Sequence, residues 1–216
     1  MRPICPDPIR AKGSFFFPQL VGDCWPCRPA TTSHPLSALD RGTGLQLTGM
    51  AWGLLPFWAK SKDLQSSAIN ARIETVATKP AFRAAIKKRR CLVPIAGDYE
   101  WSVNTEDGKK YPWFIHAAAP LWAAGLWEDA SKLLGDDNLG TFTVITGDSS
   151  GVSADIHDRM PVWLDPGQAE EWMQADAEAA MAMLLASETP VMEAYRVSRA
   201  VNSPRNNRDD LLLPVA

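Results

Sequence analysis

The sequence contains few of the residues that hold metals or form disulfides, with four cysteines and three histidines in 216 residues. So few cysteines do not make a disulfide scaffold at this length, and reduced thiols are expected. No run of 18 or more apolar residues occurs, and the start MRPICPDPIR lacks the apolar core of a secretion signal. We therefore expect no metal site, no cofactor, no association with membranes and a cytoplasmic location.

A net positive charge is also absent, since the formal net charge is -3. Proteins that coat nucleic acid nonspecifically are excluded, because that affinity comes mainly from Lys and Arg meeting phosphates. Any basic surface must therefore be local. Residues 79–90, which read KPAFRAAIKKRR, are a candidate on a short predicted helix. By itself such a segment is typical of a solvated helix face.

The length and composition are those of an ordinary globular protein, with 46% hydrophobic and 22% charged residues. A chain of this size fits one large core, so we expect a single domain over residues 1–216. Residues 1–44 are rich in Pro, Gly, Ser and Thr and show little periodicity. They predict loop with short extended pieces.

Strand-like runs dominate the middle of the chain. An apolar run from residue 45 is interrupted near Pro56, and the Asp107-Gly108 pair predicts a hairpin turn. Further strands are predicted at residues 91–101, 111–117, 121–127 and 141–146. These neighbours along the chain predict an antiparallel sheet, with a further strand followed by polar loop near the C-terminus.

One long helix is predicted over residues 166–186, with Pro early and acidic residues in its first turn. Its apolar positions are expected to face the sheet. The cluster of Met181, Met183, Leu184 and Leu185 is interpreted as core. Strands together with this helix indicate an α+β fold.

Four polar residues lie inside or beside apolar, strand-like runs, where a polar side chain needs a reason: Asn70, Arg72, Glu100 and His157. An isolated Glu100 would most often face solvent, but partial burial would raise its pKa and suit proton transfer. His157 could be a satisfied structural histidine. Beside Asp158 and Arg159 it could instead titrate near neutrality.

Four ordered blocks between residues 52 and 207 carry a family resemblance: WGLLPFWAK, NARIETVATKPAFRAAIKKRRCLVPIAGDYEW, IHDRMPVWL and VSRAVNSPRNN. Together they resemble the SOS response-associated peptidases, also called abasic site processing proteins. The resemblance implies a bent, mostly antiparallel β-sheet that forms a pseudo-barrel with flanking helices. It also implies binding to single-stranded DNA that contains abasic sites, without a cofactor, and we expect a monomer.

The chemistry implied by the resemblance is a covalent bond between an N-terminal cysteine and the ring-opened aldehyde of the abasic site. The terminal amine condenses to an imine, and the thiolate of the same residue closes a thiazolidine ring. Self-cleavage, which exposes the cysteine, and a lyase activity accompany it. By position in the motifs, Asn70 would orient the cysteine and sugar, Glu100 would shuttle protons, and His157 would assist ring opening or reversal.

The same positions imply contacts to DNA. Arg72 and Arg159 would hold phosphates near the lesion. Phe57 and Trp58 would stack on bases or wedge the strand where a base is missing. For these two aromatic residues, core packing is the alternative.

The N-terminus departs from the family pattern, which begins Met-Cys-Gly-Arg. Here Met1, Arg2, Pro3 and Ile4 precede Cys5. Cys5 could act as the nucleophile only after removal of the four residues before it. This leaves a noncovalent single-stranded DNA-binding module as the alternative function.

Two further features are considered beside the family pattern. Cys24 and Cys27 form a CxxC pair that could exchange disulfides, but no predicted strand before or helix after it supports a redox fold. Asp98 stands where the family usually has an aromatic residue. Two positions apart on a strand, Asp98 and Glu100 share a face, so one carboxyl should raise the pKa of the other.

Overall fold

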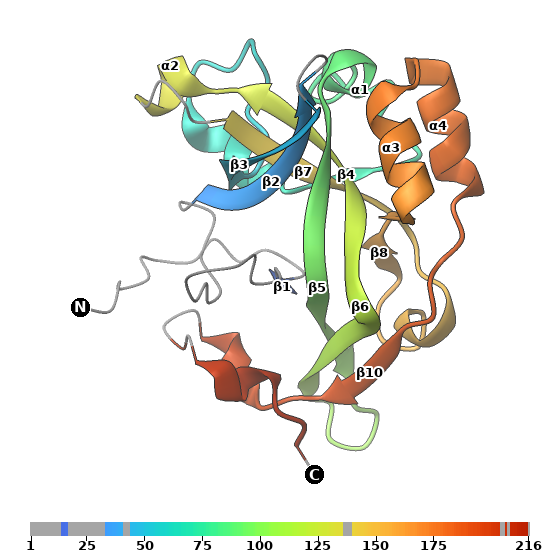
Figure 1. Cartoon of the computed structure of the whole chain (residues 1–216). Helices are drawn as coiled ribbons and strands as arrows, with labels where there is room; N and C mark the ends of the chain where they lie inside the picture. Colours follow the sequence, from blue (N-terminus) through green and yellow to red (C-terminus); the bar gives the residue numbers. More distant parts are fainter. Residues whose placement is uncertain are drawn as a thin grey trace.

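The computed structural model describes residues 14–16, 33–40, 44–135, 140–203, 206 and 208–215. Within them, ten strands belong to one curled, mixed sheet that forms a half-barrel, with short helices around it (Figure 1). The predicted α+β class and pseudo-barrel are thus confirmed. The predictions for Cys5, Cys24 and Cys27 lie outside the described residues.

The centre of the sheet is an antiparallel hairpin of β5 and β6, whose register runs from Arg90 opposite Leu126 to Val103 opposite Lys110. Its turn contains Gly108 with a φ of 66°, a left-handed conformation that glycine adopts readily, so the predicted hairpin is confirmed. The strands are β1 (Ser14–Phe16), β2 (Ser33–Asp40), β3 (Gly44–Trp52), β4 (Asn70–Arg72), β5 (Arg90–Val103), β6 (Lys110–Asp129), β7 (Gly140–Asp148), β8 (Arg159–Pro161), β9 (Trp163–Leu164) and β10 (Glu193–Arg196).

Strand β6 corrects the prediction of two strands at residues 111–117 and 121–127, because it runs unbroken for 20 residues. Its first half pairs with β10 and its second half with β7 and β9. The register with β5 shifts between Ile95 and Gly97. The irregularity lets the paired strands bend without leaving the sheet, so a bend takes the place of the expected break.

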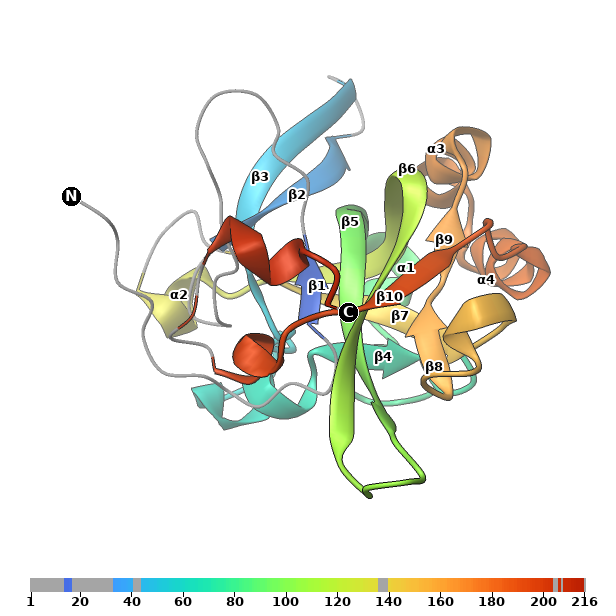
Figure 2. The ribbon, with the colours of Figure 1, turned by 90° about the horizontal axis from the view of Figure 1, so that it is seen from below.

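The sheet is mostly antiparallel, but β3 and β4 both pair with β7 in parallel. Thr146 of β7 pairs with Arg72 of β4 and also with Pro161 of β8. A strand has only two edges, so β4 and β8 flank β7 on opposite sides. Figure 2 shows this part of the sheet from below, with β4 and β8 near each other. This arrangement brings the NAR and DRMP segments together.

The predicted helix over residues 166–186 is wrong in one respect, since it is two helices, α3 (Pro166–Gln174) and α4 (Ala177–Ala186). Asp176 caps the second helix by accepting hydrogen bonds from the backbone N–H groups of Glu178 and Ala179. A capping aspartate between two helical segments starts a new helix. The shorter helices are α1 (Ala85–Lys88), α2 (Ser131–Leu134) and the 3-10 turns Lys62–Ser67, Gly151–Ser153, Arg199–Asn202 and Asp209–Leu212.

Helices α3 and α4 cover one face of the sheet (Figure 1). Trp172 of α3 is fully buried, and its indole N–H donates to the carbonyl of Cys91 on β5 at 2.9 Å. Met183 and Leu184 are in the core as predicted, whereas Leu185 is 71% exposed, which corrects the interpretation of that residue. No helix among the described residues is both long and apolar enough to cross a membrane.

Candidate functional site

Strand β4 presents Asn70 and Arg72 two positions apart, so their side chains leave the same face of the strand. The Asn70 side-chain oxygen Oδ1 is buried and has no hydrogen-bond partner within the described part of the chain. Buried polar atoms normally have partners, and an exception requires an explanation. Oδ1 of Asn70 can be explained as the acceptor of a hydrogen bond from a ligand hydroxyl or amine.

Glu100 lies in β5 with Asp98 two positions before it, and both carboxyl groups are buried, at 8% and 3% exposure. Burial first, and then the nearby charges of Asp98 and Asp158, raise the pKa of Glu100 to about 8. Burial alone raises the pKa of Asp98 to about 7. The raised pKa of Glu100, to which the charge of Asp98 contributes, agrees with the sequence prediction for this pair. At neutral pH, Glu100 is therefore mostly a proton donor rather than a carboxylate.

His157 follows the 3-10 turn Gly151–Ser153, and its backbone N–H donates to the carbonyl of Ser153. Its ring nitrogen Nδ1 accepts the backbone N–H of Arg159 at 3.1 Å. Nδ1 also lies 3.2 Å from the carbonyl oxygen of Arg159, so it accepts or donates a hydrogen bond according to the tautomer. The other ring nitrogen, Nε2, lies 3.8 Å from Glu100 Oε2. That separation exceeds a direct hydrogen bond, yet it lets both groups reach one small reacting group. The structure thus brings two of the predicted catalytic residues together.

Arg159 is more heavily engaged than the sequence suggested. Its guanidinium contacts Glu74 Oε1 at 2.6 Å, Asp148 Oδ1 at 2.6 Å and the carbonyl of Thr146 at 2.7 Å. These contacts lower the pKa of Glu74 and raise that of Arg159. Arg159 therefore links β8 to β7 and to the segment that follows β4.

Arg72 is exposed, and no ion pair holds it among the described residues. Its charge also contributes to the lowered pKa of Glu74, so both arginines lie near this carboxylate. Sequence reasoning missed Glu74 and Asp148. Glu74 could have been found from the sequence, because it stands two residues after Arg72 within the NARIE motif. Asp148 could not, because only the pairing of β7 with β8 brings it beside Arg159.

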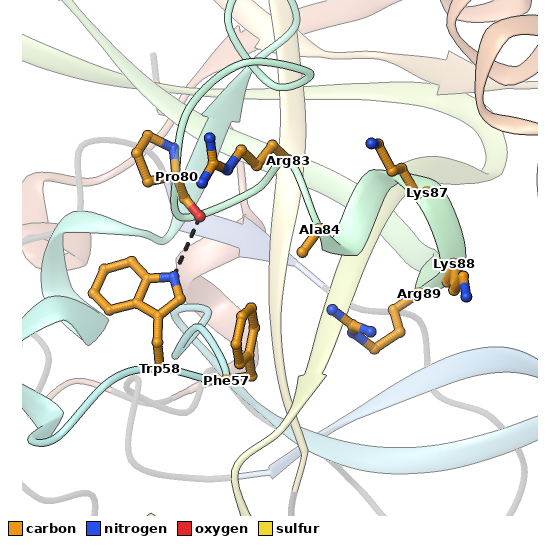
Figure 3. Close-up of a pocket in the computed structure, with 8 residues that line it drawn as sticks. All are labelled: Phe57, Trp58, Pro80, Arg83, Ala84, Lys87, Lys88 and Arg89. Atoms are coloured by element: carbon orange, nitrogen blue, oxygen red, sulfur yellow. Dashed lines mark hydrogen bonds between the residues drawn. The ribbon is translucent and has the colours of Figure 1, made fainter.

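Phe57 and Trp58 are on the surface, with exposures of 70% and 45%, so core packing is ruled out for both. They line a pocket of about 670 Å³ together with Pro80, Ala84 and basic side chains from the segment around α1 (Figure 3). None of the three predicted catalytic residues is among its lining residues. The aromatic residues and the Glu100–His157 pair are thus two separate features.

The described residues offer no group of three or more His, Cys, Asp or Glu side chains that could hold a metal ion. Cys91 is the free cysteine within the described part, and it is fully buried in β5. Burial raises the pKa of its thiol well above the ordinary value. Cys91 is therefore a core residue and is unsuited to act as a nucleophile.

Asp98→Asn should flatten the dependence of stability on pH. Because the folded state raises the pKa of Asp98 from 3.8 to about 7, its stabilising contribution is complete below about pH 4 and is lost as the pH rises through 7. Removing the ionisable group should recover about 1–3 kcal/mol of that loss near pH 8.5. Urea unfolding near pH 4 and near pH 8.5 measures the change. Parallel pH profiles for the wild type and the variant would contradict the assignment, and the exposed Asp155→Asn is the matched control.

Comparisons with known proteins agree with the resemblance read from the four blocks. The family model described as SOS response associated peptidase (SRAP) matches residues 24–204. Abasic site processing protein YoaM of Bacillus subtilis is 37% identical over 203 residues, which cover 91% of this chain and 88% of that protein. Abasic site processing protein YedK of Escherichia coli is 32% identical and covers 82% and 78%, respectively.

Solved structures show the same fold. A protein from Bacteroides thetaiotaomicron matches with a TM-score of 0.68 at 25% identity and covers 85% of this chain and 82% of that chain. A phage-related protein from Bordetella bronchiseptica matches with a TM-score of 0.64 at 29% identity, covering 84% and 85%. Since the family model spans most of the sequence and relatives above 30% identity cover most of both chains, this chain belongs to the SOS response associated peptidase family.

Proposed function

We propose that this protein binds single-stranded DNA at abasic sites and forms a covalent link to the lesion through an N-terminal cysteine. The observation that carries the proposal is the Glu100–His157 pair, in which a buried carboxyl with a pKa of about 8 lies 3.8 Å from an imidazole nitrogen. Relatives named as abasic site processing proteins support the choice of substrate.

The reaction begins when the terminal amine adds to the C1′ aldehyde of the ring-opened sugar. Glu100 donates a proton to the hydroxyl of the resulting carbinolamine, which leaves as water and gives an imine. The thiolate of the same cysteine then adds to the imine carbon, the nitrogen takes a proton, and a thiazolidine ring closes. The nucleophile must carry a free amine and a thiol on one residue, and Cys5 meets this requirement only after the bond before it is cleaved.

During these steps Asn70 positions the reacting groups, and His157 transfers protons. The unpartnered Oδ1 of Asn70 accepts a hydrogen bond from the cysteine amine or a sugar hydroxyl. His157 takes the proton of the sugar hydroxyl during ring opening, and it returns a proton when the link is reversed. A lyase activity follows if a proton is instead removed from C2′ of the imine, which expels the 3′ phosphate by β-elimination.

The contacts to DNA divide between two arginines and two aromatic residues. Arg72, which is exposed and unpaired within the described chain, binds a phosphate beside the lesion. Arg159 is saturated by Glu74 and Asp148, so it holds His157 and β8 in place and reaches a phosphate only as part of that network. Phe57 and Trp58 stack on unpaired bases.

Denaturing electrophoresis tests the proposal. The protein is incubated with a single-stranded oligonucleotide that contains one abasic site, and a heat-stable band of reduced mobility is expected. An undamaged oligonucleotide and a tetrahydrofuran analogue, which has no aldehyde, should give no such band. Binding in a native gel without any shifted denaturing band would contradict covalent linkage and favour the noncovalent DNA-binding module.

A further inference from the structure

The guanidinium of Arg159 binds two carboxylates that differ in how firmly they are held. Glu74 is bound at two points, with Nη1 donating to Oε1 at 2.6 Å and Nη2 donating to Oε2 at 3.1 Å. Asp148 is bound at one point, where Nη1 donates to Oδ1 at 2.6 Å. The side chain of Asp148 is 88% exposed, against 48% for Glu74 and 16% for Arg159. The more exposed carboxylate is therefore the one held by a single bond.

The Asp148 contact can be exchanged at little cost to the fold. The side chain makes no other hydrogen bond among the described residues, and exposed ion pairs contribute little to stability. Asp148 is the last residue of β7, and its backbone lies opposite Arg159 of β8. Rotation of the side chain therefore releases the guanidinium, while the pairing of the two strands and the bidentate contact with Glu74 stay in place.

Asp148 also cancels a positive charge beside the reaction centre, since the backbone N–H of Arg159 donates to the His157 ring. Arg159 first, and then the charge of Arg72, lower the pKa of Glu74, so both arginines lie near one carboxylate. With Asp148 in place, two positive and two negative charges cancel. Carboxylate and phosphate oxygens accept hydrogen bonds from arginine at the same distances. Asp148 Oδ1 thus occupies a position that suits a phosphate oxygen.

We propose that Asp148 is a phosphate-competing residue: its carboxylate occupies the phosphate-binding position of Arg159 and is displaced when a DNA strand docks at the reaction centre. The inference rests on the proposed function and adds a residue that sets affinity and selectivity. A lone phosphate exchanges one acceptor for another and gains little. A strand that also contacts Arg72 and places its abasic sugar beside Glu100 and His157 supplies the further binding energy that drives the exchange.

Equilibrium binding of single-stranded DNA tests the competition without covalent chemistry. The probe is a labelled strand with one tetrahydrofuran residue, and fluorescence anisotropy measures its dissociation constant. Asp148→Asn keeps the size of the side chain but removes its charge, so binding should tighten about 3- to 10-fold at low salt and less at high salt. Asp148→Glu keeps the charge and should bind like the wild type. A purely structural role predicts the reverse, because loss of the Arg159 contact would then weaken binding.

Uncharged linkages in the DNA identify the phosphate that replaces Asp148. A methylphosphonate carries no charge, and it is placed either 5′ or 3′ of the tetrahydrofuran residue. The gain in affinity from Asp148→Asn should disappear with one of these two strands. A gain that survives in both strands would overturn the proposal, because no phosphate beside the lesion would then compete with the carboxylate.

The matched control is Asp210→Asn, which removes the same charge and frees an exposed arginine, Arg208, from an ion pair of 3.2 Å. This variant should bind like the wild type. An equal gain in the control, or unchanged or weaker binding by Asp148→Asn, would reject the competition. Urea unfolding midpoints confirm that each variant folds, as expected for a side chain that is 88% exposed.

Cross-linking of the wild type to a true abasic strand is scored separately. Its failure would reject the covalent reaction of the proposed function. The tetrahydrofuran strand contains no aldehyde, so it reports on the competition at Arg159 in either case.

Discussion

Glu100→Gln should reduce the rate of cross-link formation by about 10²- to 10⁴-fold, while affinity for a tetrahydrofuran-containing strand stays within about twofold of the wild type. The amide keeps the size of the side chain but cannot give a proton to the departing hydroxyl. Single-turnover cross-linking on denaturing gels measures the rate, and anisotropy measures the affinity. An unchanged rate would remove Glu100 from the proposed chemistry.

The pH dependence sharpens this prediction. With a pKa raised to about 8, Glu100 is protonated at neutral pH, so the wild-type rate should fall as the pH rises through 8. Glu100→Gln should lack this alkaline decline. Asp98→Asn should move the decline to lower pH, because the charge of Asp98 is one cause of the raised pKa of Glu100. An alkaline decline at the same pH in all three proteins would assign it to another group.

Arg90→Met should lower the free energy of unfolding by about 3–5 kcal/mol, the largest effect expected away from the reaction centre. Arg90 is 5% exposed. Its guanidinium donates to the carbonyls of Trp172 at 2.6 Å and Ile86 at 3.0 Å, and also to that of Ala175. The substitution leaves these buried carbonyls without that donor and removes a cation–π contact 5.4 Å from the centre of the Trp172 ring.

Urea unfolding measures this loss, with Arg83→Met as the control. Arg83 lies in the same basic segment but is exposed, so its replacement should change stability by less than about 0.5 kcal/mol. The two residues differ because Arg90 makes tertiary hydrogen bonds that join the start of β5 to the C-terminal end of α3. Equal effects of the two substitutions would show that the carbonyl contacts do not stabilise the fold.

Arg90 also illustrates what the sequence could not reveal. The run KKRR reads as a solvated helix face, which holds for Lys87 and Lys88 and fails for Arg90. No local signal marks which cation turns inward, because two of its acceptors, the carbonyls of Trp172 and Ala175, lie more than 80 residues away at the end of α3. The parallel pairing of β3 and β4 with β7 was missed for the same reason, because pairing between strands far apart in the sequence produces no periodic pattern in either strand.

Local chemistry predicted other features well. The Asp107-Gly108 turn between two strand-like runs identified the β5–β6 hairpin. The break at Asp176 was readable in principle, since an Asp followed by Ala-Glu is a capping pattern, but the apolar periodicity on both sides hid it. Period-two spacing placed Asp98 and Glu100 on one face. Their depth of burial, which raises both pKa values, required the tertiary structure.

The most direct test of the account is to find which residue of the protein becomes bonded to the lesion. The cross-linked product is digested with protease and nuclease, and the peptide that carries the sugar-phosphate remnant is sequenced by mass spectrometry. We predict a peptide that begins with cysteine, with the adduct mass of a thiazolidine formed with loss of one water. An adduct on a lysine, or none at all, would contradict the proposed chemistry.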